Sequence, residues 1–123
     1  MSVLLDSVIL IDHFNGIAQA TRFIEREHRR LSISSITRAE VLAGFDESSV
    51  ALAMALLDRF RFLPMDVAVA DEAARIRRTS RLKLPDAIQA AFAVHHRLKL
   101  ATRNVKDFPP ARFTFVWVPY RVK

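Results

Sequence analysis

The chain opens with a short apolar run that ends at an aspartate. Val3, Leu4 and Leu5 lead directly into Asp6, and a second apolar run follows over residues 8–11. A continuous apolar run of this length is typical of a strand buried in a parallel sheet. An ionised carboxylate beside a dry core is costly unless it is paired, hydrogen-bonded or bound to a cation. The pattern therefore predicts a first strand with Asp6 at its carboxyl end, facing a partner from elsewhere in the chain.

Further along, the apolar positions switch between the spacing of helices and that of strands. Helices are predicted where apolar residues recur every three or four positions, and strands where short apolar or alternating runs occur. The predicted helices cover residues 8–14, about 17–29, 36–44, 47–59, 66–78 and 85–95. The remaining predicted strands cover residues 31–35, 62–65, 98–102 and 113–118. Strands that alternate with helices indicate a parallel sheet with helices on both faces.

Two of these helices carry further predictions. Thr37 and Glu40 fit a capping box at the start of the helix over residues 36–44. The helix over residues 47–59 is apolar nearly all round, with Leu57 on one face and Leu52 on the other. Such a helix is more often buried on two sides. We therefore expect it to contact both the core and the second subunit of a homodimer.

The composition excludes several classes of protein. A chain of 123 residues with 51% hydrophobic residues predicts a single domain over residues 1–123, with one core. There is no cysteine, which excludes a disulfide scaffold, a thiolate metal site and a cysteine nucleophile. Only two glycines occur, so a glycine-rich phosphate loop is excluded. No apolar run approaches the roughly 20 residues of a membrane span, and no basic region precedes the first apolar run, so we expect no membrane association and a cytoplasmic protein.

The charge balance favours a polyanionic partner. Lysine and arginine total 19 against 13 acids, which gives a net charge of +6. Such a balance is typical of proteins that bind RNA, DNA or acidic segments. Arg38, Arg103, Lys106 and the basic run over residues 75–83 are candidates for contacts with an RNA backbone, and solvated surface charge is the alternative for each.

Three other acids occupy positions similar to that of Asp6. Glu40 and Asp86 lie in the first turn of predicted helices, and Asp107 lies in the loop after the strand over residues 98–102. Because these junctions share one edge of a parallel sheet, we expect the four acids to meet there. Four carboxylates would repel one another unless a hard divalent cation such as Mg²⁺ or Mn²⁺ lay between them. Each acid alone is explained by a helix cap, the helix dipole or a surface loop, so the prediction rests on their conjunction.

Four blocks of the sequence resemble the PIN-domain nucleases, and within them the VapC-like toxins of bacterial toxin–antitoxin pairs. The blocks are Leu5–Asp12, Ser34–Gly44, Leu84–Ala93 and Leu100–Phe108. The resemblance extends over nearly the whole chain, and the order and spacing of the four blocks make it specific. It implies a three-layer α/β/α fold with a central, mainly parallel sheet of about five strands.

The resemblance also implies an activity and partners. The implied activity is that of an endoribonuclease that depends on Mg²⁺ or Mn²⁺ and hydrolyses phosphodiester bonds of RNA. The implied protein is a toxin, dimeric and held inactive by a cognate antitoxin protein.

The same resemblance implies the residues of the site. By motif position, Asp6, Glu40, Asp86 and Asp107 match the metal-binding and catalytic acids of the family, with Asp6 and Asp86 as the central ligands. The positions that match supporting polar residues are Ser7, Thr37, Thr102 and Asn104. Val8 departs from the family, which often has asparagine there, and the loss of that amide weakens the support of Asp6.

Two alternatives stay open from the sequence. One is a PIN-like module that binds RNA or protein with little or no nuclease activity. Val8 favours this alternative slightly, whereas the complete set of four acids argues against it. The other is a purely structural role, in which the acids are caps and surface charge. Replacement of Asp6 distinguishes these alternatives, because a metal ligand is needed for cleavage and a structural acid is needed for stability.

Overall fold

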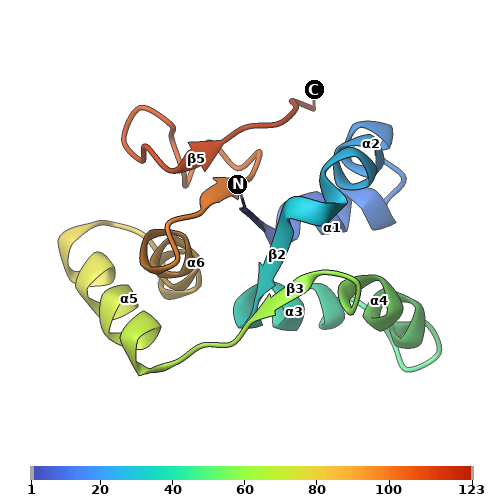
Figure 1. Ribbon diagram of the computed structural model, residues 1–123, viewed down its shortest axis with the longest axis horizontal. Helices are drawn as coiled ribbons and strands as arrows, with labels where there is room; N and C mark the ends of the chain where they lie inside the picture. The colour runs from blue at the N-terminus through green and yellow to red at the C-terminus, as the bar shows by residue number, and fades with distance from the viewer. Residues whose placement is uncertain (1, 123) are drawn as a thin grey trace.

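A five-stranded parallel sheet forms the centre of the protein in the computed structural model, which describes residues 2–122 (Figure 1). The strand order is β3-β2-β1-β4-β5, with every pair parallel. The strands are β1 (Val3–Leu5), β2 (Leu31–Ser34), β3 (Arg61–Leu63), β4 (Lys99–Ala101) and β5 (Val116–Trp117). Val3 pairs with Leu31 on one side and Lys99 on the other, so the first strand of the chain lies in the middle of the sheet.

Helices cover both faces of this sheet, as the alternation of elements predicted. They are α1 (Ser7–Phe14), α2 (Ala18–Glu27), the short 3₁₀ helix η1 (His28–Arg30), α3 (Ser35–Leu42), α4 (Val50–Leu57), α5 (Val67–Thr79) and α6 (Leu84–His95). Asp66 caps α5 by accepting a hydrogen bond from the Val69 N–H at 2.9 Å, as expected of an N-cap acid. No helix within residues 2–122 has both the length and the apolar character needed to cross a membrane.

The side chains of β1 alternate between two apolar cores. Val3 and Leu5 pack with Phe23 of α2 on one face of the sheet. Leu4 packs with Phe92 of α6 on the other face. Because successive side chains of a strand point to opposite faces, this central strand contributes to both cores. The predicted three-layer α/β/α fold with about five strands is confirmed.

The start of α3 differs from the prediction. The N-cap is Ser34, whose Oγ accepts a hydrogen bond from the Thr37 N–H at 3.2 Å. The Thr37 hydroxyl instead donates to the Leu5 carbonyl at 3.2 Å. The predicted capping box between Thr37 and Glu40 is therefore wrong, and the Glu40 side chain reaches toward β1 and α1 instead.

Two other elements are shorter than predicted by four residues or more. The helix α4 covers eight residues, and Asp46 accepts hydrogen bonds from the backbone N–H groups of Ser48 and Ser49 in the loop before it. Its inner residue Leu57 is buried, whereas Leu52 is 77% exposed, so α4 has one buried face within the chain. Its contact with a second subunit stays a prediction. The last strand is limited to Val116–Trp117.

Candidate active site

Asp6 directly follows β1 and caps α1, and its carboxylate accepts hydrogen bonds from three donors. Its Oδ1 accepts hydrogen bonds from the Ser7 N–H at 2.9 Å and from Gln89 Nε2 at 3.2 Å. Its Oδ2 accepts a hydrogen bond from the Thr102 hydroxyl at 2.7 Å. Burial raises the pKa of Asp6 and outweighs these hydrogen bonds, which lower it. The side chain is 7% exposed, so a fixed carboxylate lies at the edge of the solvent.

The other three predicted acids lie within electrostatic reach of Asp6. Glu40 comes from α3, Asp86 from the first turn of α6, and Asp107 from the loop after β4. Burial, followed by repulsion from Asp107, Asp6 and Glu40, raises the pKa of Asp86 to about 6. Burial also raises the pKa of Glu40, with a smaller contribution from Asp6. The structure therefore brings together the four acids that the sequence predicted to meet.

Three of the predicted supporting residues, Ser7, Thr102 and Asn104, contact the acids directly, and Thr37 contacts them through Gln89. The Ser7 hydroxyl donates to Glu40 Oε1 at 3.0 Å. Asn104 donates from Nδ2 to Asp107 Oδ2 at 2.9 Å, and its backbone N–H donates to the Thr102 hydroxyl at 3.0 Å. Since Thr102 in turn donates to Asp6, a continuous chain of hydrogen bonds joins Asp107 to Asp6. The Thr37 hydroxyl accepts a hydrogen bond from Gln89.

Gln89 is a site residue that sequence reasoning missed. Its Nε2 donates to the Thr37 hydroxyl at 2.7 Å and to Asp6, and its Oε1 accepts from the Ser34 hydroxyl at 2.6 Å. The side chain is 2% exposed, among the buried alanines of α6. A polar residue three positions after Asp86 in an otherwise apolar stripe was the available signal. Gln89 gives Asp6 an amide donor, which is the kind of group that the resemblance found lacking at Val8.

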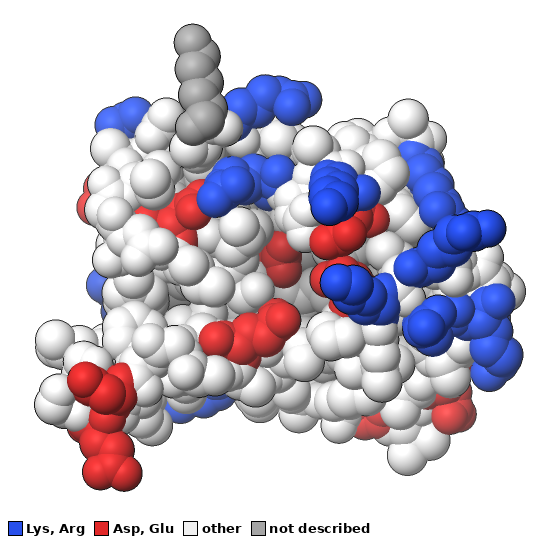
Figure 2. All heavy atoms as spheres, turned by 180° about the vertical axis from the view of Figure 1, so that it is seen from behind, with Lys and Arg blue, Asp and Glu red and all other residues white. Residues whose placement is uncertain are grey.

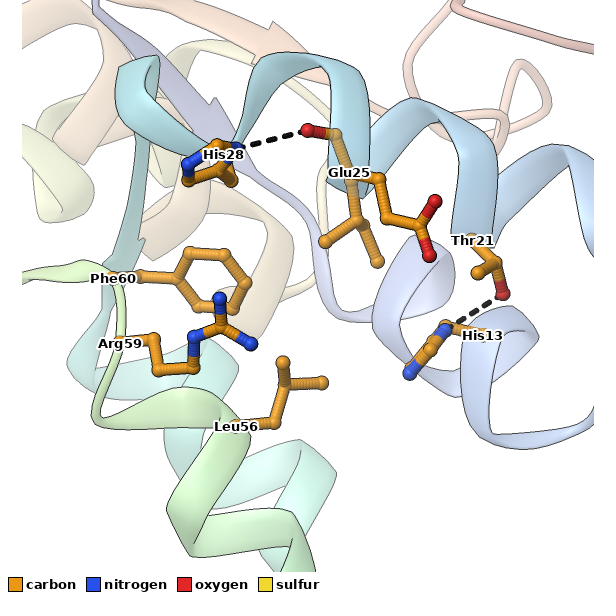
Figure 3. Close-up of a pocket in the computed structure, with 8 residues that line it drawn as sticks. His13, Thr21, Glu25, His28, Leu56, Arg59 and Phe60 are labelled. Atoms are coloured by element: carbon orange, nitrogen blue, oxygen red, sulfur yellow. Dashed lines mark hydrogen bonds between the residues drawn. The ribbon is translucent and has the colours of Figure 1, made fainter.

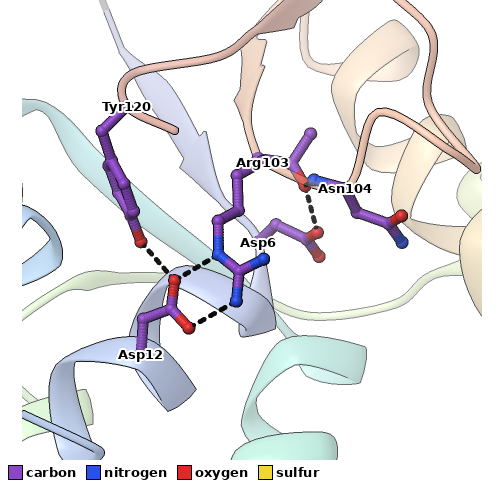
Figure 4. Close-up of polar contacts among 6 residues, drawn as sticks. Asp6, Asp12, Arg103, Asn104 and Tyr120 are labelled. Atoms are coloured by element: carbon purple, nitrogen blue, oxygen red, sulfur yellow. Dashed lines mark hydrogen bonds and ion pairs between the residues drawn. The ribbon is translucent and has the colours of Figure 1, made fainter. Parts of the chain in front are cut away.

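A second polar cluster lies beside the acids and was also missed (Figure 4). Arg103 donates from Nε and Nη2 to the two carboxylate oxygens of Asp12, the latter at 2.7 Å. The Tyr120 hydroxyl donates to Asp12 Oδ2 at 2.8 Å. The Arg103 hydrogen bonds hold the pKa of Asp12 below its usual value, and burial raises the pKa of Tyr120. The cluster ties α1 to the loop after β4 and to the segment after β5.

The three cations predicted to contact RNA have different surroundings. Arg103 is occupied by Asp12, and Arg38 pairs with Asp58 at 2.9 Å. Lys106 has no carboxylate within 4.0 Å among the described residues. Contact of Arg38 and Arg103 with RNA stays a prediction, and it would require these ion pairs to be shared with the RNA or exchanged for it.

The chemistry of the acidic cluster fits a hard divalent cation. Within residues 2–122, no three acid, histidine or cysteine side chains already converge as the ligands of one metal ion would. Asp107, Asp6 and Glu40 each repel Asp86, and all four side chains offer oxygen atoms alone as ligands. Oxygen ligands are those that Mg²⁺ and Mn²⁺ prefer. A divalent cation between these side chains would remove the repulsion.

A separate groove lies between α1, α2 and the end of α4. Its volume is about 420 Å³. The residues that line it are His13, Thr21, Ile24, Glu25, His28, Leu56, Arg59 and Phe60. Figure 3 shows His13 bonded to Thr21 on one side, with Leu56, Arg59 and Phe60 facing it from the other. The groove thus combines an apolar floor with polar groups at its rim.

The fold and the acidic cluster together define a three-layer α/β protein with a carboxylate site at the carboxyl edge of its parallel sheet. Residues 3–111 match the family model of the PIN domain. The chain belongs to the PIN domain family, in agreement with the resemblance of its four sequence blocks.

Individual relatives agree with this assignment. Ribonuclease VapC10 of Mycobacterium tuberculosis is 34% identical over 114 residues, which covers 87% of this chain and 86% of the relative. A toxin–antitoxin complex from Klebsiella pneumoniae contains a chain 36% identical, with a TM-score of 0.90 over 98% of this chain and all of that one. FitAcB from Neisseria gonorrhoeae shares the fold at 24% identity, with a TM-score of 0.79 over 98% of this chain and 99% of that one.

Proposed function

We propose that this protein is an endoribonuclease, the toxin of a toxin–antitoxin pair, and that its activity depends on Mg²⁺ or Mn²⁺. The observation that carries the proposal is the meeting of Asp6, Glu40, Asp86 and Asp107 at one edge of the sheet. Membership of the PIN domain family supports it. The relatives named as a ribonuclease and as part of a toxin–antitoxin complex also support it.

The side chains of the site would have different roles in phosphodiester hydrolysis. Asp6 and Asp86 would hold the metal ion, and Glu40 and Asp107 would complete its ligands directly or through water. When bound, the ion supplies charge neutralisation for the phosphate and lowers the pKa of a water molecule. Thr102 and Gln89 keep both Asp6 oxygens oriented. One carboxylate of the cluster would orient the attacking water or accept its proton.

The test is RNA cleavage by the purified protein with Mg²⁺, with Mn²⁺ and with EDTA, beside Asp6→Asn. We expect metal-dependent cleavage that falls at least 100-fold in the variant. Asp71→Asn, at an exposed acid of α5, is the matched control and should cleave normally. Calorimetric titration with Mn²⁺ should show binding to the control and not to Asp6→Asn.

Two outcomes would contradict the proposal. Binding of RNA and Mn²⁺ by the unaltered protein without any cleavage would favour the alternative, a PIN-like binding module with little or no nuclease activity. Loss of stability in Asp6→Asn, with cleavage and Mn²⁺ binding unchanged, would favour a purely structural role for the acid.

The antitoxin is the partner that we propose for the groove of Figure 3. Ile24, Leu56 and Phe60 give it an apolar floor that a short apolar segment of the partner would cover. Bound there, the antitoxin would lie along α1 and α2, from where a basic side chain can extend toward the acids. The exposed Leu52 on α4 is the proposed centre of the homodimer contact. Leu52→Asp should therefore shift the protein from dimer to monomer in light scattering.

A further inference from the structure

A basic cleft opens directly beside the acidic cluster. Its volume is about 240 Å³, and it lies between the segment before α6 and the loop after β4. The residues that line it are Arg81, Leu82, Lys83, Lys106, Asp107, Pro109 and Arg112. Four of these seven residues are cations, and the single acid is Asp107, a member of the acidic cluster. The cleft therefore has one end at the proposed reaction site.

The charge of the cleft is not neutralised inside the protein. Among the described residues, none of its four cations has a carboxylate within 4.0 Å, whereas arginines 26, 30, 38, 75 and 103 all do. Arg112 lies 5.3 Å from the centre of the Phe113 ring and contacts no acid. Like charges around a small cleft repel one another, and an anion bound among them would relieve that repulsion.

The backbone that carries these cations is anchored on both sides of the cleft. Leu82 is 6% exposed and packs into the core beside α5 and α6. Phe108 is fully buried in the same core. The Asn104 side chain donates to Asp107 at the start of the same loop. Anchored cations lose less conformational freedom on binding than cations on a free segment.

The cleft and the acidic cluster are neighbours on the surface of the protein. The Lys83 charge lowers the pKa of Asp86 against the effects that raise it, so the two groups are electrostatic neighbours. Figure 2 shows acidic side chains near the middle of one face, with basic side chains next to them and more along one margin. A carboxylate cluster repels a polyanion, so a polyanionic substrate needs cations close by to remain there.

We propose that this cleft binds a backbone phosphate of single-stranded RNA one or more nucleotides away from the phosphate at the acids. The cations would then set the direction in which the strand crosses the site and hold it against the repulsion of the carboxylates. Phosphate contacts of this kind position a strand without reading its sequence. RNA fits better than an acidic protein segment because Asp107 joins the cleft to a site suited to a phosphate. This inference rests on the proposed function.

The test compares Arg81→Gln/Arg112→Gln with Arg22→Gln/Arg29→Gln, which removes the same charge from exposed positions on α2 and η1. Both pairs are made in the Asp6→Asn protein, and binding of a fluorescein-labelled single-stranded RNA is followed by anisotropy at several salt concentrations. We expect the cleft pair to weaken binding at least 10-fold. The magnitude of the slope of log K against log salt should fall by about 0.7, because the cleft contacts one phosphate and each lost phosphate contact on a single strand removes about 0.7. The control pair Arg22→Gln/Arg29→Gln should change binding less than two-fold.

Three results would overturn the inference. The first is an equal loss in both pairs, which would assign binding to net charge alone. The second is unchanged RNA binding by the cleft pair, in a variant whose melting temperature shows that it is folded normally. The third is displacement of the RNA by polyglutamate as readily as by unlabelled RNA, which would assign the cleft to an acidic protein.

Failure of the proposed function is a separate result. It would be seen as absence of RNA cleavage by the protein with Asp6 intact, and this result does not depend on how the two arginine pairs bind RNA in the anisotropy measurement.

Discussion

Arg103 holds both carboxylate oxygens of Asp12, and this ion pair joins the loop after β4 to the buried side of α1. Asp12 is 4% exposed, and Tyr120 donates to the same carboxylate. The two residues adjacent to Arg103 in the chain are Thr102, which contacts Asp6, and Asn104, which contacts Asp107. The ion pair therefore fixes the loop segment from which two of the site contacts come.

Asp12→Asn should destabilise the protein by about 2 kcal/mol, because it leaves the partly buried Arg103 guanidinium without its charge partner. The pKa of Asp12 is lowered in the folded protein, so its contribution is present above 3.8, the value without such contacts. The difference between the variant and the original protein should shrink as the pH falls below that value. Urea unfolding at several pH values measures this.

Tyr120→Phe is the control for the same cluster. It removes one hydrogen bond and leaves the ion pair intact, so it should cost only about 1 kcal/mol. Equal stability of Asp12→Asn and the original protein at neutral pH would show that the ion pair does not fix the loop.

Gln89→Leu should reduce both stability and turnover. It leaves the buried groups of Ser34, Thr37 and Asp6 without their shared amide partner, at a cost of about 2 kcal/mol. Because the amide orients Asp6, we expect RNA cleavage to fall about 10-fold with little change in KM. Gln19→Leu, at an exposed position of α2, should change stability by less than about 0.5 kcal/mol. Normal turnover in Gln89→Leu would reduce Gln89 to a packing role.

Asp86→Asn should stabilise the protein in EDTA at neutral pH. The folded state raises the pKa of Asp86 from 3.8 to about 6. Between these values the folded state binds a proton that the unfolded state does not, so stability falls as the pH rises and the full penalty applies above about 6. After allowance for solvent screening we expect a gain of about 1 kcal/mol. The gain should disappear toward pH 4 in thermal unfolding, whereas Asp71→Asn should show no such profile.

Leu56→Lys should separate inhibition from catalysis. The substitution places a charge on the floor of the groove between α1, α2 and α4, away from the acids. We expect the co-expressed antitoxin to be lost on affinity purification, while RNA cleavage by the free variant stays within two-fold of normal. Retention of the antitoxin in stoichiometric amount would place its binding surface elsewhere.

The fold was predictable because its signals are local. Apolar runs and helical spacing located the five strands and the six α-helices, and Pro85 and Asp66 marked the starts of α6 and α5 correctly. The start of α3 was not predictable. Ser34 and Thr37 both carry a hydroxyl that can cap a helix, and the Leu5 carbonyl, which binds the Thr37 hydroxyl, lies on another strand.

The site was predictable to the extent that its residues break a local pattern. Asp6 interrupts an apolar run, and its position at the end of a strand predicted where the other acids would meet it. Gln89 contacts Asp6 across 83 positions, and Tyr120 contacts Asp12 across 108 positions. Gln89 does interrupt an apolar stripe, but no local pattern identifies the partner of either residue, because the fold alone brings each pair together.

The central place of β1 in the sheet has a consequence for the order in which the protein is made. The backbone N–H of Asp6 donates to the Ala101 carbonyl at 3.0 Å, and the Asp6 carboxylate accepts a hydrogen bond from the Thr102 hydroxyl. The ribosome synthesises Asp6 at the outset, and β4, one of the two strands beside β1, only after residue 98. A growing chain of the proposed toxin therefore has no complete site until β4 and the loop after it have been made.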